Sequence, residues 1–311
     1  MDFFDLHCDT ASALMENGQG LEDNTLHVSL KKAGAFGRWA QVFALFIHDK
    51  NGPEAAYALY EKQYESFQRQ LAKHGDKIVQ CRTGQDLENA FAAGKRAAIL
   101  SVENGSALGG RLDTLERFQQ DGVRLLTLTW FGENELGYGS MAGGPLKPFG
   151  RQVLEALPGH GILPDISHLS DEGVAEVFSL YSGPLVATHS NVRAQCGHCR
   201  NLTKSQITEI ARRGGLIGIN LCRAFLGGPK DNAEYASCED VYRHLCAFLE
   251  LGAAHTVCFG TDFDGASVPR DIGNIAGIPA LYDYLLGRNL AQSLLQDVFF
   301  ENACRFWQRV M

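Results

Sequence analysis

The 311-residue sequence contains no apolar run long enough to cross a membrane, and it has no block of basic residues. A spanning helix needs about 20 consecutive apolar residues, so we expect no membrane partner. Lys and Arg number 28 against 36 Asp and Glu, and this net charge of −8 argues against a surface for nucleic acid. The acidic start Met1–Asp5 lacks the features of a signal peptide, and the last residues carry no lipid-anchor signal. These absences predict a cytoplasmic protein.

The cysteines number nine, an odd count, and are scattered through the chain, which without a secretory signal indicates reduced thiols in a cytosol. Cys196 and Cys199 form one C-x-x-C motif, a pattern found in redox pairs and in half of a zinc site. Here the motif lies in a predicted loop and no second C-x-x-C follows, so an incidental loop pair is favoured. Because Arg200 comes next, oxidation of the pair to a disulfide would stiffen this loop, and the sequence leaves open whether that disulfide forms.

Short apolar segments alternate with segments of helical periodicity along the whole chain. The apolar segments are nearly continuous, as expected of parallel strands buried on both faces. Eight alternations without a linker or internal repeat favour a single (β/α)8 TIM-type barrel domain over residues 1–311, with two further helices in the tail Ile278–Met311. The predicted strands are Phe3–His7, Trp39–Phe46, Ala97–Val102, Arg124–Thr129, Ile162–Ser167, Leu185–Thr188, Leu216–Leu221 and Thr256–Gly260.

Helix starts and long loops complete this outline. Residues suited to helix capping precede four predicted helices. Two long glycine-containing loops, Gly132–Pro148 and Arg223–Ala236, follow predicted strands, and loops of this length usually bind ligands or close over a site. The predicted helices are Pro53–Lys73, Leu87–Ala93 after Thr83, a helix from Ser170 to Leu180, Lys204–Arg213 after Thr203, and Glu239–Leu251 after Ser237.

Side chains able to bind a metal end five of the eight predicted strands. Residues i and i+2 of a strand point the same way, so the H-x-D pair at the first strand can reach one cation. In a barrel, the carboxyl ends of all strands converge on one face, so groups far apart in sequence share a pocket. Three imidazoles and three carboxylates suit two divalent ions that share a carboxylate, zinc best, with manganese or cobalt as alternatives. The residues are His7, Asp9, Glu103, His168, His189 and Asp262.

Each of these residues taken alone also has a purely structural explanation. A buried histidine after a strand is more often a hydrogen-bonded core residue than a ligand, and Glu103-Asn104-Gly105 resembles a turn. The segment Asp262–Gly265 resembles a turn or part of a calcium loop, but a calcium loop starting at Asp262 requires glutamate at its twelfth position, which is Gly273. The recurrence at five strand ends is what favours a metal centre.

The same residues lie in motifs that resemble the membrane (renal) dipeptidase family, zinc dipeptidases among the amidohydrolase-type barrels. The resemblance covers nearly the whole chain in motif order. The motifs are His7-x-Asp9, Val102-Glu103-Asn104-Gly105, Leu126-Thr127-Leu128-Thr129, Ile166-Ser167-His168, Thr188-His189-Ser190-Asn191, Arg200-Asn201-Leu202-Thr203 and Gly260-Thr261-Asp262-Phe263-Asp264-Gly265.

The resemblance implies a role for each residue. Glu103 would bridge two zinc ions, Asp262 would shuttle a proton near the bridging water, and Arg200 would hold the free carboxylate of a dipeptide. A planar guanidinium fork suits a carboxylate, and an unligated carboxylate can accept a proton and pass it to a leaving amine. The other implied zinc ligands are His7 and Asp9 for one ion, and His168 and His189 for the other.

Two positions depart from the animal enzymes of this family. Trp130 stands where they have a histidine that contacts substrate, and it either shapes the pocket or belongs to the core. Polarisation of the scissile carbonyl would then rest on the metals or on a group of the following loop, such as Asn134. Cys222 stands where the family often has a tyrosine, and Arg223 follows it. The hypothesis is that Arg223 enters the pocket and favours acidic dipeptides.

The sequence therefore predicts a dipeptidase with two zinc ions per chain. The family resemblance adds tolerance of a D-residue at the carboxyl position and frequent dimerisation, so a homodimer is possible. Two alternatives remain open: a barrel hydrolase acting on another amide or a lactone, and a metal-binding protein without catalysis. The H-x-D motif and Arg200 argue against the first, and Asp262 argues against the second.

Overall fold

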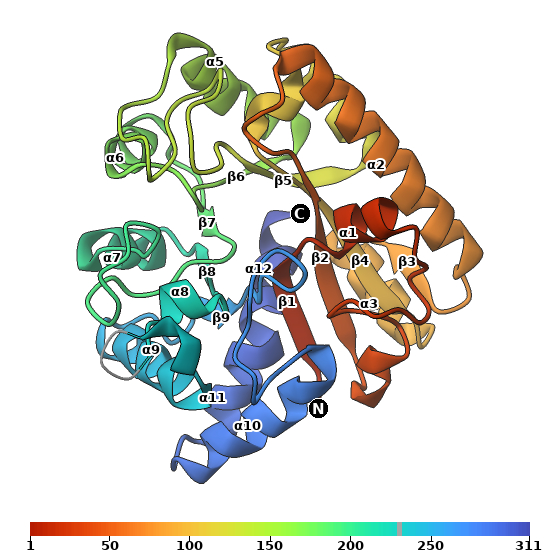
Figure 1. Cartoon of the computed structure of the whole chain (residues 1–311), viewed down its shortest axis with the longest axis vertical. Helices are drawn as coiled ribbons and strands as arrows, with labels where there is room; N and C mark the ends of the chain where they lie inside the picture. Colours follow the sequence, from red (N-terminus) through yellow and green to blue (C-terminus); the bar gives the residue numbers. More distant parts are fainter. Residues whose placement is uncertain (229–231) are drawn as a thin grey trace.

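A computed structural model describes residues 1–228 and 232–311 of the chain. Its strands are all parallel and form one sheet, in which β2 pairs with both β1 and β4 and thereby closes an eight-stranded barrel. Helices surround the strands (Figure 1). The predicted (β/α)8 barrel is confirmed. The barrel strands are β1 (Phe3–Cys8), β2 (Trp39–Phe46), β4 (Arg96–Glu103), β5 (Val123–Thr127), β6 (Leu163–Asp165), β7 (Val186–Ala187), β8 (Leu216–Ile219) and β9 (Val257–Phe259).

A ninth strand, β3 (Ile78–Gln80), was not expected from the sequence. It pairs with the first residues of β4, where Ile78 lies beside Arg96, while β5 pairs with the second half of β4. Because β3 has three residues and includes an exposed Val79, it lacks the continuous apolar run that marks the other strands.

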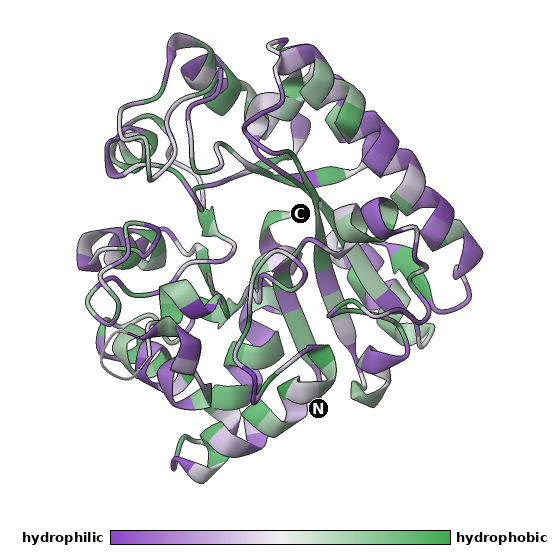
Figure 2. Cartoon of the chain, viewed as in Figure 1, coloured by the Kyte–Doolittle hydropathy of each residue, from purple (hydrophilic) through white to green (hydrophobic). Residues whose placement is uncertain are grey.

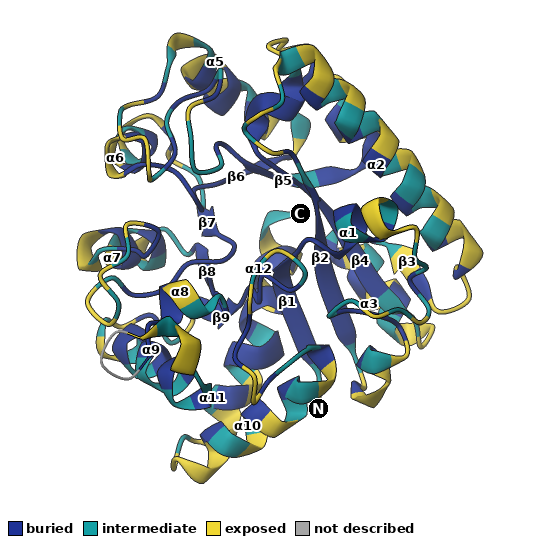
Figure 3. Ribbon diagram, viewed as in Figure 1, coloured by how far each residue is buried: buried dark blue, intermediate teal, exposed yellow. Residues whose placement is uncertain are grey.

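The strands form the interior of the molecule, and most of their residues are apolar and buried (Figures 2 and 3). Six consecutive residues of β1 are buried, as expected for a strand covered by the barrel core on one side and by helices on the other. The outer helices turn apolar faces inward and polar faces to solvent. None of the helices in the described parts of the chain has the length and apolar character needed to cross a membrane.

Several helices begin where the capping residues predict. Pro53–Lys73 forms α2 with the predicted bounds. Reciprocal capping boxes start α3 (Gly84–Ala92) at Thr83, α7 (Lys204–Arg212) at Thr203 and α9 (Cys238–Glu250) at Ser237, and Ser170 caps α6 (Asp171–Leu180). The helices not singled out from the sequence are α1 (Thr10–Asn17), α4 (Thr114–Asp121), α5 (Pro148–Ala156) and α8 (Arg223–Leu226).

The C-terminal segment closes the amino-terminal end of the barrel. It forms two helical stretches: α10 (Ile278–Gly287), and a second that runs from α11 (Gln292–Gln296) through a π-helical turn into α12 (Asn302–Val310). Trp307 of α12 packs on Phe4 of β1, with ring centroids 6.4 Å apart. The carboxyl ends of the strands are thus left as the face available for a site.

Both long loops contain structure of their own. Within residues 132–148, Glu133 and Tyr138 form an antiparallel bridge. The loop predicted at Arg223–Ala236 begins with α8 and includes a short 3-10 turn at Ala233–Tyr235, while its residues 229–231 lie outside the described part of the chain.

Candidate metal centre

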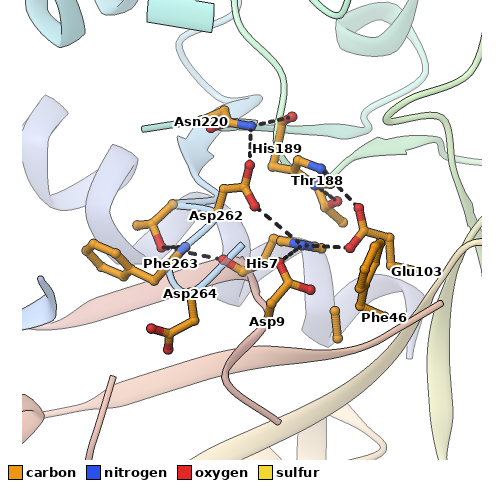
Figure 4. A network of polar contacts seen from close by, with 12 residues as sticks. His7, Asp9, Phe46, Glu103, Thr188, His189, Asn220, Asp262, Phe263 and Asp264 are labelled. Carbon is orange, nitrogen blue, oxygen red and sulfur yellow. Dashed lines mark hydrogen bonds and ion pairs between the residues drawn. The ribbon is translucent and has the colours of Figure 1, made fainter. Parts of the chain in front are cut away.

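The six predicted metal-binding side chains converge at the carboxyl ends of the strands, and all of them except His168 are labelled in Figure 4. Glu103, the last residue of β4, lies at their centre. Its Oε1 is 3.0 Å from Nε2 of His168 and 3.6 Å from Nε2 of His189, and its Oε2 is 3.4 Å from Nε2 of His7. One carboxylate therefore faces three imidazoles from three other strands.

Three overlapping groups within this cluster have donor atoms within 4.8 Å of one another. Glu103 joins His7 and Asp9 in one group, and His168 and His189 in the second. The third consists of His7, His189 and Asp262. All six residues are buried. Two of the three groups thus share the Glu103 carboxylate.

Backbone strain accompanies the cluster. A positive φ is uncommon for residues other than glycine, yet His168 has φ 70° and Asp262 has φ 61°. Asn104 and Asp264, next to Glu103 and near Asp262, have φ values of 82° and 68°. Such conformations persist where surrounding contacts hold them, and they concentrate at functional sites.

A relay of hydrogen bonds orients His189. Asp165 accepts hydrogen bonds at Oδ2 from the hydroxyls of Thr127 and Thr188, each 2.6 Å long. Because the Thr188 hydroxyl donates to Asp165, it accepts from Nδ1–H of His189 at 2.8 Å, which leaves the Nε2 electron pair directed at Glu103. Sequence reasoning did not assign Asp165 or Thr188 a role, although an aspartate in a buried strand is itself a signal.

A second buried aspartate, Asp5 of β1, connects this strand to β2 and to the segment that follows β9. It accepts hydrogen bonds from the backbone N–H and the hydroxyl of Thr261, at 2.8 and 2.7 Å, and from Gln41 at 2.9 Å. Burial raises the pKa of Asp5 to about 6, although the hydrogen bonds that it accepts act to lower this pKa. Asp5 thus ties β1, which carries His7, to the segment that carries Asp262.

The donor chemistry fits a divalent metal ion. Burial lowers the pKa of His168 to about 4 and also lowers the pKa of His189, so both imidazoles are neutral near pH 7 and have an electron pair to share. Among the described residues, Nε2 of His7 and Oδ1 of Asp9 are buried without a hydrogen-bond partner. Buried polar atoms of this kind are costly unless something binds them.

Gly265 leaves room for these groups. A methyl group at this position would lie 1.9 Å from Oδ2 of Asp9 and 2.5 Å from Oδ1 of Asp262. Any other residue would therefore displace one of the two carboxylates. The glycine that resembles part of a turn in the sequence is a requirement of the site.

A cavity of about 600 Å³ opens above the cluster and is lined by Asp9, Glu103, His168 and Asp262. Trp130 is part of its wall. The centroid of its ring lies 5.1 Å from that of Phe46 and 4.8 Å from that of His48. Of the two possibilities for Trp130, the pocket wall is the one that the geometry supports. The cavity has the size and mixed lining of a small-molecule site.

Arg200 lies beside this cavity and is buried, with only 3% of its surface exposed to solvent. Its Nη1 donates to the hydroxyl of Ser190 at 3.0 Å and its Nη2 to the backbone carbonyl of His189 at 2.9 Å, while its Nε is buried without a partner among the described residues. Burial lowers the pKa of Arg200. The guanidinium lies 5.6 Å from the ring of Phe225, which does line the cavity.

Asn134 does not suit the role of polarising a substrate carbonyl. Its Nδ2 donates to Oδ1 of Asn104 and to the carbonyl of Leu128, both at 2.8 Å, and its Oδ1 accepts from two backbone N–H groups of its own loop. Both amide protons are thus used inside the protein. The sequence placed Asn134 in the correct loop but could not show that its amide holds that loop together.

Arg223 does line the cavity, and so does Glu234, with which it is paired. Its Nη1 donates to Oε2 of Glu234 at 3.0 Å. Cys222 lines the cavity beside it, and burial raises the pKa of the Cys222 thiol to about 11.

Cys196 and Cys199 are both free thiols, and Cys196 contacts the carbonyl of Ala224 in α8.

A closed parallel barrel with histidines and carboxylates gathered at its carboxyl end defines a metal-dependent hydrolase of the barrel type. The model of the membrane dipeptidase family, peptidase family M19, matches residues 1–311, and the chain belongs to this family. It is accordingly a hydrolase of the metallo-dipeptidase class.

Solved structures agree with this assignment over the whole chain. A metallopeptidase from Rhodobacter sphaeroides, solved with a phosphinate mimic of the dipeptide L-Ala-D-Ala, is 26% identical with a TM-score of 0.93, and the match covers 100% of this chain and 99% of that one. Dipeptidase AC, a metallopeptidase of family M19, is 27% identical with a TM-score of 0.93, and the match covers 100% of this chain and 98% of that one. An uncharacterized protein in the pqqA 5′ region of Klebsiella pneumoniae is 28% identical over 252 residues, 78% of this chain and 92% of that protein.

Proposed function

We propose that the protein hydrolyses the peptide bond of dipeptides with two zinc ions bound per chain, and that it accepts a D-residue at the carboxyl position. The observation that carries the proposal is the position of Glu103, whose two oxygens face His7 on one side and His168 and His189 on the other. A carboxylate shared between two sets of neutral or carboxylate donors is suited to a pair of divalent ions.

The residues divide between the two ions by their geometry. His7 and Asp9 with Glu103 would hold one zinc, and His168 and His189 with Glu103 would hold the other. Bound zinc lowers the pKa of a coordinated water and polarises a carbonyl group. The Asp165–Thr188–His189 relay keeps one imidazole in the tautomer that this requires.

Asp262 is proposed as the proton carrier. Its Oδ2 accepts a hydrogen bond from Nδ2 of Asn220 at 3.0 Å, which holds the carboxylate at the edge of the cluster. Burial raises the pKa of Asp262, which brings this carboxyl closer to the range in which it exchanges protons at neutral pH. As water adds to the peptide carbonyl, Asp262 accepts its proton and then gives that proton to the nitrogen of the departing amine.

Arg200 is proposed to recognise the free carboxylate of the dipeptide. It is a buried cation next to the cluster, with a donor nitrogen that has no partner among the described residues. Its bonds to Ser190 and to the backbone of His189 fix the guanidinium relative to a proposed zinc ligand. A carboxylate held there places the scissile bond at a set distance from the cluster. Tolerance of a D-residue is supported by the L-Ala-D-Ala mimic bound to the similar Rhodobacter sphaeroides enzyme.

Three matched substrates test this proposal. The zinc-loaded protein is expected to hydrolyse L-Ala-L-Ala and L-Ala-D-Ala, and to hydrolyse L-Ala-D-Ala amide at least about tenfold less efficiently, because the amide lacks the charge that Arg200 would bind. Released alanine is measured by chromatography. Equal efficiency with the amide would contradict the role of Arg200, and failure on every free dipeptide tested would contradict the proposed reaction.

A further inference from the structure

The cavity wall opposite the strand ends carries a cation whose role the proposed reaction does not explain. Arg223 is the first residue of α8, directly after the segment that contains Asn220. Its backbone N–H donates to the carbonyl of Ser267 at 2.9 Å, and Ser267 lines the same cavity. Only 20% of the Arg223 side chain is exposed. The backbone of Arg223 is therefore fixed in the wall, and its side chain is largely shielded from solvent.

Among the described residues, the carboxylate that pairs with Arg223 is also shared with a second arginine. Oε2 of Glu234, also in the cavity wall, accepts a hydrogen bond from Nη1 of Arg223 at 3.0 Å. The other oxygen of Glu234 contacts the guanidinium of Arg270. Within the described part of the chain, two arginines thus share one carboxylate, and Arg223 is the one of the two that lines the cavity.

Among the described residues, two further acidic groups of the cavity, Asp264 and Glu16, form no ion pair with Arg223. Asp264 accepts hydrogen bonds from the hydroxyl of Thr10 at 2.6 Å and from the backbone N–H of His27. Glu16 lies on α1, and among the described residues no ion pair joins it to Arg223. A negative group that enters from solvent is the partner that would complete the network.

We infer that the Arg223–Glu234 pair is a specificity site for a dipeptide with an acidic side chain, so that the protein prefers an aspartyl or glutamyl residue over its amide counterpart. The inference rests on the proposed function, because it concerns the substrate side chain and takes the site of hydrolysis as given. A guanidinium has five N–H donors in a planar fork, and one of them is used by Glu234. A substrate carboxylate can accept from the others.

Glu234 determines how strong this preference is. Its carboxylate competes with the substrate for Arg223, so it lowers the affinity for an acidic side chain. It also holds Arg223 in place when no substrate is bound, which limits the entropy lost on binding. Glutamine at this position keeps an oxygen that can accept the hydrogen bond from Arg223, so Glu234→Gln removes the competing charge but keeps the positioning contact. It is therefore expected to act in the opposite direction from removing the charge of Arg223, and this opposition distinguishes direct recognition from a general disturbance of the wall.

Pairs of isosteric substrates measure the preference. L-Glu-L-Ala is compared with L-Gln-L-Ala, and L-Ala-L-Glu with L-Ala-L-Gln, so each ratio of kcat/KM reports the charge of one side chain at one position. The wild-type protein is expected to favour the acid at one position at least. Arg223→Met, which keeps an unbranched side chain of similar reach, is expected to lower that ratio about tenfold, as for a charge-assisted hydrogen bond in a partly exposed setting. Glu234→Gln is expected to raise it about threefold.

Arg151→Met is the matched control. Arg151 forms an ion pair with Glu176 outside this cavity, so its loss is expected to leave both ratios unchanged. If the ratio in Arg223→Met equals that of the wild type, the inference is wrong. If Arg223→Met does not fold by circular dichroism, Glu234→Gln decides: a ratio that stays the same or falls overturns the inference. Wild-type hydrolysis of all four peptides without preference would overturn it while supporting the proposed function, whereas hydrolysis of none would contradict the proposed function instead.

Discussion

Replacing Glu103 with glutamine is expected to abolish dipeptide hydrolysis and to remove bound zinc. Glutamine keeps the shape of the side chain, but its amide has one acceptor oxygen and no charge. Glu103 faces His7 with one oxygen and His168 with the other, so the change affects both proposed metal sites at once. Loss of a residue that only hydrogen-bonds to a metal ligand already lowers metal affinity or activity about ten- to a hundredfold. For loss of the shared ligand itself, we expect kcat/KM to fall by more than about a hundredfold.

The measurement combines kcat/KM for L-Ala-D-Ala with zinc per chain by elemental analysis. Glu65→Gln provides the control, because Glu65 is an exposed residue of α2 that faces Arg69 at 3.9 Å. It is expected to retain wild-type activity and zinc. Retention of both zinc ions and of activity within tenfold of wild type by Glu103→Gln would show that Glu103 is not the shared ligand.

Asp262→Asn is expected to lower kcat by about a hundred- to ten-thousandfold, the range in which a positioned acid–base group contributes. The asparagine oxygen can still accept the hydrogen bond that Asn220 donates to Asp262, so the local structure is expected to survive. The amide cannot take up or release the proton. Zinc content and KM should therefore stay close to wild type, with the loss confined to kcat.

The same variant separates two roles that the geometry allows for Asp262. This residue also forms a group of possible ligand atoms with His7 and His189. If Asp262→Asn lost one equivalent of zinc along with its activity, Asp262 would be a ligand and not a proton carrier. Asp283→Asn, on the exposed face of α10, is the control for the introduction of an amide. A kcat above a tenth of wild type would contradict both roles.

The positions of the six candidate ligands could be predicted from the sequence because they follow from topology. His7 and Asp262 are far apart in the chain, but His7 lies at the carboxyl end of β1 and Asp262 follows β9, and a barrel brings the carboxyl ends of its strands together. The prediction requires only the alternation of strands and helices and the residue type at each strand end. It requires no knowledge of individual contacts.

The features that escaped prediction depend on contacts between distant segments. The sequence predicts both Asn134 and Arg223 at the pocket; Arg223 does line the cavity, but nothing local shows that the amide of Asn134 binds its own loop instead. The support of His189 by Asp165 through Thr188 likewise depends on pairing between neighbouring strands. Strand β3 escaped prediction because three residues carry too little periodicity.

Titration of metal-free protein with zinc tests the central claim most directly. Zinc is removed with a chelator and returned in steps, while hydrolysis of L-Ala-D-Ala is followed at each step. Two ions that share Glu103 predict negligible activity without metal and a rise that reaches its plateau at two equivalents of zinc per chain. Full activity in the metal-free protein, or a plateau at one equivalent, would contradict the shared two-metal centre.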